Sequence, residues 1–299
     1  MQVLAEKLGN FIPQDKIRFR EPMAAHTSFR IGGPVTYMVE PQNTLQLKQV
    51  LSLLKQHDIP FFILGNGSNL LVNDRGFDGV AVKIGPEMSK VSVEGNRITA
   101  GAGVLMSRVA KAALEHGLTG LEFASGIPGT LGGGIVMNAG AYGGELKQVV
   151  TRVTVLTPES EVLELDKAAM EFGYRHSIVK AKGYIVTEVV MELQEGDREQ
   201  IKAYMDDLAA RRREKQPLEY PSAGSTFKRP EGYFAGELIM KAGLRGYQIG
   251  GARVSDKHCG FVVNMGGATA EDVHRLIEYV QDKVYEVYGV RLEPEVIFL

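Results

Sequence analysis

Residues 123–144 read FASGIPGTLGGGIVMNAGAYGG, a run of 22 residues with eight glycines, one proline and no charged side chain. Glycine lets a backbone adopt positive φ and approach a ligand without a Cβ in the way, and free peptide N–H groups in such a segment form concavities that bind anions. The run is long enough to cross a membrane, but nine of its 22 residues are glycine or proline, which disfavours a stable apolar helix. It predicts a loop that binds the pyrophosphate of a nucleotide cofactor. A set of buried turns without a ligand is the alternative, which leaves buried amides without partners.

The composition limits the class of protein. The chain has 299 residues, enough for two or three domains, and a formal net charge of −2, which argues against a nucleic-acid-binding protein or a polybasic membrane patch. Cys259 is the only cysteine and six histidines are scattered, so we expect no disulfide and no metal site. Residues 1–16 lack the pattern of a secretory signal, and we expect a cytoplasmic protein.

The first part of the chain has the pattern of a strand, a helix and a second strand. Residues 29–41 read as a strand entered through a glycine turn, and residues 60–65 read as a short buried strand. Between them, Asn43 or Thr44 begins an amphipathic helix that ends near residue 58. This order is typical of a βαβ unit and predicts a small parallel sheet.

The middle of the chain has an α+β pattern. Residues 91–104 and 150–165 alternate around turns and predict two antiparallel hairpins, with a helix near 107–116 and the glycine-rich stretch between them. A polar helix over 197–215 follows.

The C-terminal part contains one strongly periodic helix. The capping box Thr269–Asp272 predicts its beginning, and Gly289 predicts its end. Residues 290–299 read as a final strand. In an extended strand Glu293 and Glu295 share one face, which indicates either a site edge or ordinary surface charge. The opposite face is expected to carry Leu292, Val296 and Phe298.

Common cofactor and hydrolase motifs are absent. The chain has no Gly-x-Gly-x-x-Gly that opens a helix, no Gly-Lys dipeptide, no His-Glu-x-x-His and no Gly-x-Ser-x-Gly. We therefore predict that phosphate binds at the glycine turn at 65–69, which follows a strand, and at the loop at 125–144. Two such loops suit a dinucleotide bound without a Rossmann fold.

Two further segments carry chemistry. Ser225 lies three residues before Lys228, but Lys-Thr-Gly and Ser-Asp-Asn, which accompany the Ser-x-x-Lys hydrolases, are missing. Ser225 is then either a proton donor or a turn residue that satisfies its own backbone. Arg175 stands among aromatic residues in FGYRHS and suits bidentate binding of a carboxylate.

Taken together, these segments resemble the flavin-dependent UDP-N-acetylenolpyruvoylglucosamine reductase (UDP-N-acetylmuramate dehydrogenase) family of bacterial cell-wall synthesis. The ordered set covers nearly the whole chain. The resemblance is carried by HTSFRIGGP at 26–34, LGNGSNLLV at 64–72, SGIPGTLGGGIVMNAGAYGG at 125–144, FGYRHS at 172–177, AGSTFKRP at 223–230, GGARVSDKHCGFVVN at 250–264 and LEPEV at 292–296.

The resemblance implies an α+β fold with a two-part FAD-binding module of the vanillyl-alcohol-oxidase type and a smaller α+β substrate domain. We expect FAD-binding subdomains at residues 1–84 and 85–205 and a substrate-binding domain at 206–290. The final strand, 291–299, is expected to return to the first subdomain.

The resemblance also implies the activity. Hydride passes from NADPH to non-covalent FAD and then to the enolpyruvyl ether of UDP-N-acetylglucosamine, and protonation of carbon 2 gives UDP-N-acetylmuramate, a peptidoglycan precursor. The expected partners are these small molecules, with no nucleic acid and no membrane, and the expected state is a monomer. Another non-covalent FAD oxidoreductase of the same cofactor fold is the alternative enzyme, and a nucleotide-binding module without catalysis is the alternative from another class.

Matched by residue, Ser225 corresponds to the proton donor, and Arg175 and Glu295 to the pair that holds the enolpyruvyl carboxylate and stabilises the enol. Lys215 corresponds to a basic residue on the substrate diphosphate, and Lys228 and Tyr174 are further candidate substrate contacts. The residues expected to bind the cofactor are Gly65, Asn66, Gly67, Ser68, Asn69, Ser125, Gly126, Ile127, Pro128, Gly129, Thr130, Gly133, Gly134, Asn138, Ala139, Gly140 and Ala141.

The chain departs from the better-known members of the family in two places. Lys228-Arg229-Pro230 stands where they carry Lys-Asn-Pro. The interval between Arg175 and Ser225 is also too short for their extra loop, whose tyrosine closes over the substrate, so the chain resembles the shorter subclass and Tyr233 is a candidate substitute.

Overall fold

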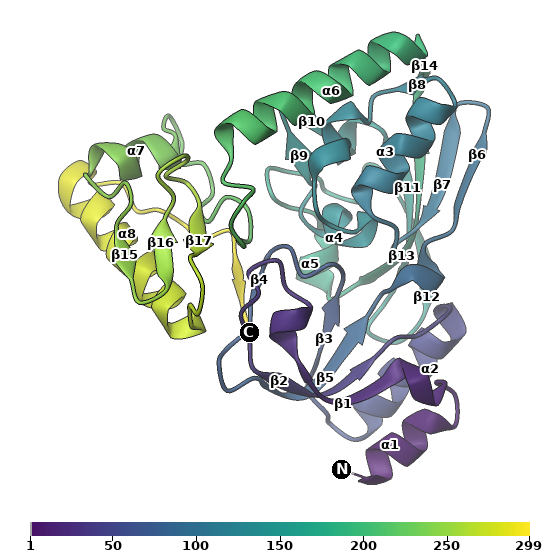
Figure 1. Ribbon diagram of the computed structural model, residues 1–299. Coiled ribbons are helices and arrows are strands. Elements are labelled where there is room, and N and C mark those ends of the chain that lie inside the picture. The colour runs from purple at the N-terminus through teal and green to yellow at the C-terminus, as the bar shows by residue number, and fades with distance from the viewer. Residues whose placement is uncertain (1) are drawn as a thin grey trace. The chain divides into compact units, whose positions relative to one another are not determined.

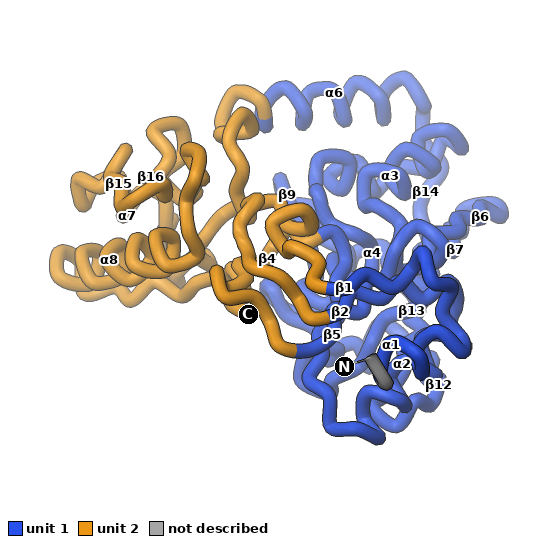
Figure 2. Tube along the Cα trace, turned by 60° about the horizontal axis from the view of Figure 1, so that its bottom comes forward, with its two compact units in different colours: residues 1–19, 37–66, 79–212 blue, residues 20–36, 67–78, 213–299 orange. Residues whose placement is uncertain are grey.

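The computed structural model describes the backbone of residues 2–299. It divides into two compact units, coloured blue and orange in Figure 2. Unit 1 comprises residues 1–19, 37–66 and 79–212, and unit 2 comprises residues 20–36, 67–78 and 213–299. Each unit is therefore assembled from three separate stretches of the chain. The three-part division expected from the sequence stays a prediction.

The first sheet contains the predicted strand–helix–strand pattern. It has four strands in the order β1-β2-β5-β3, and β3 pairs with β5 in parallel (Figure 1). Helix α2 begins where the sequence predicts, because the side chain of Asn43 accepts a hydrogen bond from Gln46 N at 3.0 Å. The elements of this part are α1 (Gln2–Gly9), β1 (Ile17–Pro22), β2 (Pro34–Val39), α2 (Thr44–Gln56), β3 (Phe61–Leu64) and β5 (Phe77–Lys83).

The second sheet contains both predicted hairpins. Its five strands are antiparallel in the order β12-β11-β13-β7-β6, with the turn of the first hairpin at Glu94 and Arg97. Helices α3 and α4 contact this sheet (Figure 1). The elements are β6 (Val91–Glu94), β7 (Arg97–Gly101), α3 (Met106–Glu115), α4 (Leu131–Val136), β11 (Val150–Leu156), β12 (Val162–Asp166), α5 (Ile178–Lys182), β13 (Ile185–Glu192) and α6 (Arg198–Lys215).

Each unit buries its own hydrophobic core. In unit 1 the core side chains come from α2, α3 and the inward faces of both sheets. Helix α3 shows why: Met106, Val109, Ala110 and Ala113 recur at helical spacing and are all buried. Burial of apolar side chains of this kind is the main favourable term in folding.

Short strand pairs complete unit 1. Strand β8 (Leu118–Thr119) pairs with β14 (Gln194–Glu195), and β9 (Gly140–Ala141) pairs with β10 (Gly144–Glu145). The second pair lies inside the glycine-rich stretch.

Unit 2 is organised around the long helix α8 (Ala270–Tyr288). The predicted capping box is present, since Asp272 N donates to Thr269 Oγ1 at 3.0 Å and Thr269 N donates to the Asp272 carboxylate at 3.1 Å. Gly289 ends the helix with φ of 65°. The other elements of the unit are β4 (Leu70–Leu71), α7 (Ala235–Lys241), β15 (Gln248–Ile249), β16 (Ala252–Val254), β17 (Val262–Asn264) and β18 (Ile297–Phe298).

The predicted final strand is shorter than its pattern indicates. Only Ile297–Phe298 forms a strand, β18, which pairs in parallel with β4. Leu292 and Val296 are buried as expected, but Phe298 is 40% exposed, so the expected apolar face does not continue to the end. The segment changes its pairing partner: Pro294 forms a bridge with Phe227, whereas Ile297–Phe298 pairs with β4, so no single ladder runs through residues 290–299.

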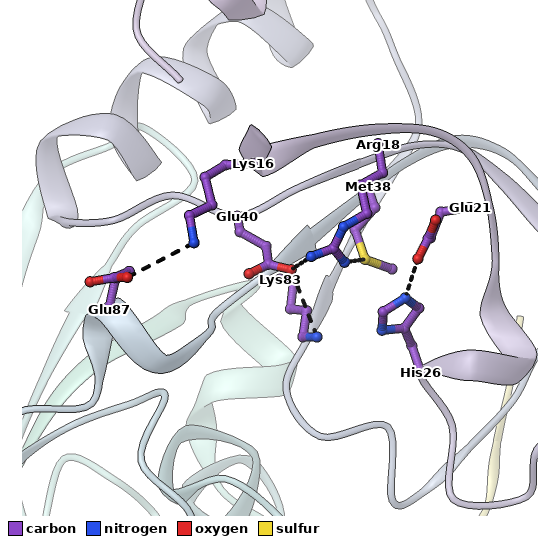
Figure 3. A network of polar contacts seen from close by, with 8 residues as sticks. All are labelled: Lys16, Arg18, Glu21, His26, Met38, Glu40, Lys83 and Glu87. Atoms are coloured by element: carbon purple, nitrogen blue, oxygen red, sulfur yellow. Dashed lines mark hydrogen bonds and ion pairs between the residues drawn. The ribbon is translucent and has the colours of Figure 1, made fainter. Parts of the chain in front are cut away.

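Ion pairs support the first sheet (Figure 3). In unit 1 the buried carboxylate of Glu40 lies 2.9 Å from Arg18 Nη2 and 3.8 Å from Lys83 Nζ. In unit 2 the His26 ring lies 2.7 Å from Glu21 Oε1. Two cations beside one buried carboxylate compensate its desolvation, so we assign this network to stability.

Across residues 2–299, no helix combines the length and the apolar character needed to cross a membrane.

Candidate active site

The glycine-rich stretch folds into a short helix preceded by an extended segment. Helix α4 begins after Thr130, whose hydroxyl accepts from Gly133 N at 3.4 Å. The backbone is fixed to the sheet side by Leu131 N, which donates to Val104 O at 2.7 Å, and by Gly132 N, which donates to Ala102 O at 2.9 Å. The loop is thus rigidly placed, as a preformed ligand site requires.

The two glycine loops assigned to one cofactor lie side by side. Asn66 Nδ2 donates to the carbonyl oxygen of Pro128. A Cβ on Gly65 would collide with Thr130 Oγ1, so only glycine lets the two segments approach this closely. Residues 65–66 and the glycine-rich loop, far apart in sequence, therefore lie against each other within unit 1.

The three consecutive glycines of α4 have different surroundings. A Cβ on Gly132 would lie 2.8 Å from Ala102 Cβ, and one on Gly134 would lie 3.0 Å from Leu146 Cδ1 and Met106 Sδ. Gly133 is exposed, and only the Thr130 hydroxyl, at 3.4 Å, lies within 4 Å of its Cβ position. A side chain at residue 133 would fill the open space beside Gly133. Without one, a dinucleotide can come close to the backbone there.

Arg212 is a residue of this surface that the sequence reasoning missed. Its guanidinium lies against Gly126, where a Cβ would collide with Nη1. Burial lowers the pKa of Arg212 from its ordinary value, with the nearby Tyr142 acting in the opposite direction. The sequence predicted only a polar helix over residues 197–215 and gave Arg212 no role. The missed signal is that Arg212 follows the buried Leu208 by four residues and so shares its face of α6.

Arg175 sits at the tip of a tight turn in unit 1. Gly173 N donates to His176 O at 3.0 Å, and His176 N donates to Gly173 O at 3.3 Å. Arg175 adopts the left-handed region, with φ of 52°, which is strained for a residue other than glycine and typical of functional turns. Its guanidinium carbon lies 5.3 Å from the ring centroid of the exposed Tyr174, and its Nη2 lies 3.5 Å from Gly140 O.

Asn138 connects this turn to the glycine-rich stretch. Its buried side chain donates to Glu145 Oε2 at 2.7 Å and Gly173 O at 3.0 Å, and accepts from Lys147 N at 2.9 Å. The amide is therefore saturated by protein groups and holds Gly173, two residues before Arg175. Its expected contact with the cofactor stays a prediction.

Ser225 and Glu295 lie on two paired segments of unit 2, with Thr226 at the junction. Ser225 Oγ donates to Phe227 O at 3.2 Å. Glu295 N donates to Thr226 O at 2.8 Å, and Phe227 forms an isolated bridge with Pro294. The backbone of Glu295 is thus paired with that of Thr226, the residue that follows Ser225.

The glycine turn at residues 67–69 adjoins the same segments. Gly67 has φ of 60°, and a Cβ there would collide with the carbonyl oxygen of His26. Asn69 Nδ2 donates to Glu295 O at 3.0 Å, and Ile297 N donates to Asn69 O at 3.0 Å. Asn69 therefore fixes the backbone on both sides of Val296, directly after Glu295.

The candidate substrate cations have different surroundings. The side chain of Lys228 forms an ion pair with that of Glu293. The backbone N–H of Lys228 also donates to the carbonyl oxygen of Glu293 at 2.9 Å. Lys215 is exposed at the end of α6. Arg229, where better-known relatives carry asparagine, has its guanidinium carbon 4.0 Å from the ring centroid of Phe234.

Comparisons with known proteins define the class. Residues 35–166 match the FAD binding domain family. A solved alkyldihydroxyacetonephosphate synthase has a TM-score of 0.50 at 20% identity, over 65% of this chain and 40% of its own. The predicted two-part FAD-binding module followed by a smaller α+β domain is confirmed. The chain therefore belongs to the class of FAD-binding proteins.

The second family match is more specific. Residues 216–299 match the C-terminal domain of UDP-N-acetylenolpyruvoylglucosamine reductase. Proteins of that name from Caldanaerobacter subterraneus and Clostridioides difficile are 53% and 51% identical, over 99% and 97% of this chain and 97% and 95% of theirs. The crystal structure of the Thermus caldophilus reductase has a TM-score of 0.81 at 34% identity, over 93% of this chain and 97% of its own. The chain belongs to the UDP-N-acetylenolpyruvoylglucosamine reductase family.

Proposed function

We propose that this protein reduces UDP-N-acetylglucosamine enolpyruvate to UDP-N-acetylmuramate with NADPH as the electron donor, as a cytoplasmic monomer in peptidoglycan precursor synthesis. The observation that carries the proposal is the pairing of the Ser225 and Glu295 segments around Thr226. It places a hydroxyl and a carboxyl group, the two kinds of side chain that protonation of an enol needs, on neighbouring backbone segments.

FAD fits the surface formed by the two glycine loops. When bound there, FAD would supply hydride transfer from NADPH to the vinyl carbon of the substrate. Gly126, Thr130 and Gly133 would present backbone groups to its pyrophosphate, since each of the two glycines is exposed and lacks a Cβ. The Arg212 guanidinium beside Gly126 adds a cation at the same place.

Arg175 binds the substrate carboxylate and stabilises charge that develops on it. A guanidinium presents paired N–H donors that match a carboxylate, and the turn 173–176 fixes its direction. Preorganised donors of this kind act on the transition state because no reorganisation is needed when the charge appears. Glu295 shares this role by hydrogen bonding to the enol oxygens.

Ser225 donates the proton to carbon 2. Before reaction its hydroxyl hydrogen is held by the carbonyl of Phe227, and rotation about the side-chain bond redirects it to the enol. The O–H bond of serine breaks as the C–H bond forms, and the alkoxide is reprotonated from solvent. Lys215, Lys228 and Tyr174 contact the sugar nucleotide, with the two cations at its diphosphate.

The test is an anaerobic two-step experiment on the purified holoprotein. Denaturation should release free FAD, and NADPH should bleach the bound flavin. Addition of the enolpyruvyl substrate should restore the flavin absorbance and yield UDP-N-acetylmuramate. A flavin that is bleached by NADPH but restored only by oxygen or by an electron acceptor other than the enolpyruvyl substrate would contradict the proposal and favour another FAD oxidoreductase.

A further inference from the structure

His258 lies beside Ser225, and the sequence analysis gave it no role although it stands in the quoted segment 250–264. A Cβ built on Gly260 would lie 3.0 Å from His258 Cε1 and 3.6 Å from Ser225 Oγ. The imidazole and the hydroxyl therefore flank the same small space, and that space exists because residue 260 has no side chain. Both residues belong to unit 2.

A second glycine, Gly236, also packs against the imidazole of His258. A Cβ on Gly236, in α7, would lie 3.4 Å from His258 Cε1 and 3.0 Å from Gly260 N. The ring of Phe261 contacts the imidazole edge-on, with centroids 5.0 Å apart. The ring thus lies between two glycines and a phenyl group, which fixes its orientation.

A chain of hydrogen bonds leads from this imidazole to Ser225. Gly260 N donates to His258 Nδ1 at 3.2 Å. Gly260 O accepts from Thr226 N at 2.8 Å, so Gly260 is bonded on one side to the histidine and on the other to the residue after Ser225. Thr226 is fully buried, and its hydroxyl accepts from Val262 N at 2.9 Å.

The protonation state of His258 suits an acceptor. Burial lowers the pKa of His258 from its ordinary value, which favours the uncharged ring, and a hydrogen bond with its own backbone acts in the opposite direction. Because Nδ1 accepts from Gly260, the remaining ring proton is on Nε2.

We propose that His258 is a positioning residue for Ser225, acting through its Nδ1 acceptor on Gly260, so that the serine hydroxyl meets one face of the enol. The inference rests on the proposed function. Loss of the acceptor frees Gly260 and with it the Thr226 backbone, and a displacement of the donor by about 1 Å can slow a positioned step by ~10²-fold.

The experiment uses side chains that imitate one ring nitrogen at a time. An asparagine oxygen can occupy nearly the position of Nδ1, whereas a glutamine amide reaches the position of Nε2. In stopped-flow measurements, His258→Leu and His258→Gln should be reduced by NADPH at the wild-type rate but re-oxidised by substrate about ten- to a hundred-fold more slowly. His258→Asn should recover most of that loss.

A second readout separates positioning from general damage. When the Ser225 hydroxyl is correctly oriented, it protonates carbon 2 of the enol from one face only. The lactyl product then has a single configuration at carbon 2. In His258→Leu, solvent competes for the proton, and the product should contain both configurations by NMR. Gly260→Ala keeps both side chains but displaces the imidazole, and should show the same mixture.

Two controls separate a positioning role of His258 from general damage to the protein. His274→Leu removes an exposed histidine of α8 and should behave as wild type. Every variant is also checked for FAD content and melting temperature. A wild-type re-oxidation rate with a single configuration in His258→Leu would overturn the inference, as would rescue by glutamine in place of asparagine. If Ser225→Ala itself turned over normally, the proposed role of Ser225 would fail, and this inference with it.

Discussion

At the scale of single residues, three side chains carry the proposed chemistry, and each is held by its backbone. Arg175 lies in the turn closed by the bridge between Gly173 and His176, and its backbone is left-handed with φ of 52°. Ser225 and Glu295 are held through Thr226. Substitutions at these positions should alter rates with little effect on folding, because the packing around them is provided by neighbours.

Ser225→Ala should abolish proton donation without affecting cofactor reduction. The hydroxyl takes no part in flavin binding or in the reaction with NADPH, so bleaching should proceed at the wild-type rate. Turnover should fall by ~10²–10⁴-fold, the usual effect of removing a positioned general acid. Ser225→Cys, which retains a transferable proton, should keep more activity than Ser225→Ala. Turnover of Ser225→Ala near the wild-type rate would mean that Ser225 is only a turn residue.

Arg175→Lys and Glu295→Gln should slow the second half-reaction more than the first. Lysine lacks the planar fork of arginine, and glutamine cannot share a proton with an enol oxygen. Stopped-flow reduction by NADPH should stay within a few-fold of wild type, while re-oxidation by the enolpyruvyl substrate slows markedly. Equal losses in both half-reactions would argue against the assigned roles.

At the scale of elements, the short helix α4 combines two roles in neighbouring residues. Gly132 and Gly134 face the core, while Gly133 faces outward. The helix interior is poor in side chains, and glycine is unfavourable in helices by about 1 kcal/mol relative to alanine. We infer that the open outer face is retained because a ligand occupies it.

Valine substitutions at adjacent glycines should separate cofactor binding from folding. Gly133→Val should fold with a melting temperature of the apoprotein close to wild type but purify without flavin, because its Cβ extends into the cofactor surface. Gly134→Val should lower the melting temperature, because its Cβ would be 3.0 Å from Leu146 and Met106. Full flavin occupancy in Gly133→Val would contradict the assignment of this face to FAD.

The capping box of α8 gives a pH-dependent contribution to stability. Hydrogen bonds from the backbone N–H of Thr269, and then from that of Gly251, lower the pKa of Asp272 in the folded state. A lowered pKa means that the stabilisation is present above the unfolded pKa of about 3.9 and is lost as pH falls through the folded value. Asp272→Asn should therefore melt below wild type at pH 7, with a difference that shrinks below about pH 4. Asp282→Asn, on the exposed side of the same helix, is the control. A difference that stayed constant with pH would contradict the explanation.

At the scale of the whole molecule, the two units have separate cores. The core of unit 1 is built mainly from the two sheets with α2 and α3, and the core of unit 2 from α7, α8 and the strands beside them. Most of the expected cofactor residues, 65–66 and 125–141, belong to unit 1.

Removal of FAD should destabilise the molecule unevenly. A ligand that binds only the folded state stabilises what it contacts. Hydrogen exchange of the FAD-stripped protein should therefore show faster exchange in residues 123–144 and at 65–66, with α8 (270–288) little changed. Readdition of FAD should restore the protection. Equal loss of protection in α8 would mean that the cofactor does not bind mainly through these loops.

Much of the local structure was predictable because its causes are local. The Asn43 cap, the hairpin turn at 94–97 and the capping box of α8 each depend on residues a few positions apart, and all three are confirmed. The glycine-rich stretch was recognisable for the same reason, since the absence of side chains is a property of the segment itself. The final strand was predicted too long because alternation alone does not show that the segment changes its pairing partner, from Phe227 at Pro294 to β4 at Ile297.

The amino-acid sequence by itself indicated the local elements and the two glycine loops, because periodicity and turn residues are properties of short segments. Its resemblance to a known family implied the fold class and the candidate chemical side chains. Only the tertiary structure decided which of them meet. It brings Asn66 to Pro128, Arg212 to Gly126 and His258 to the space beside Ser225. These contacts join segments separated by tens of residues, and they depend on how the cores pack and on where the missing Cβ atoms leave room. No local pattern contains that information, because a hydrogen bond or a close approach is a property of two segments at once.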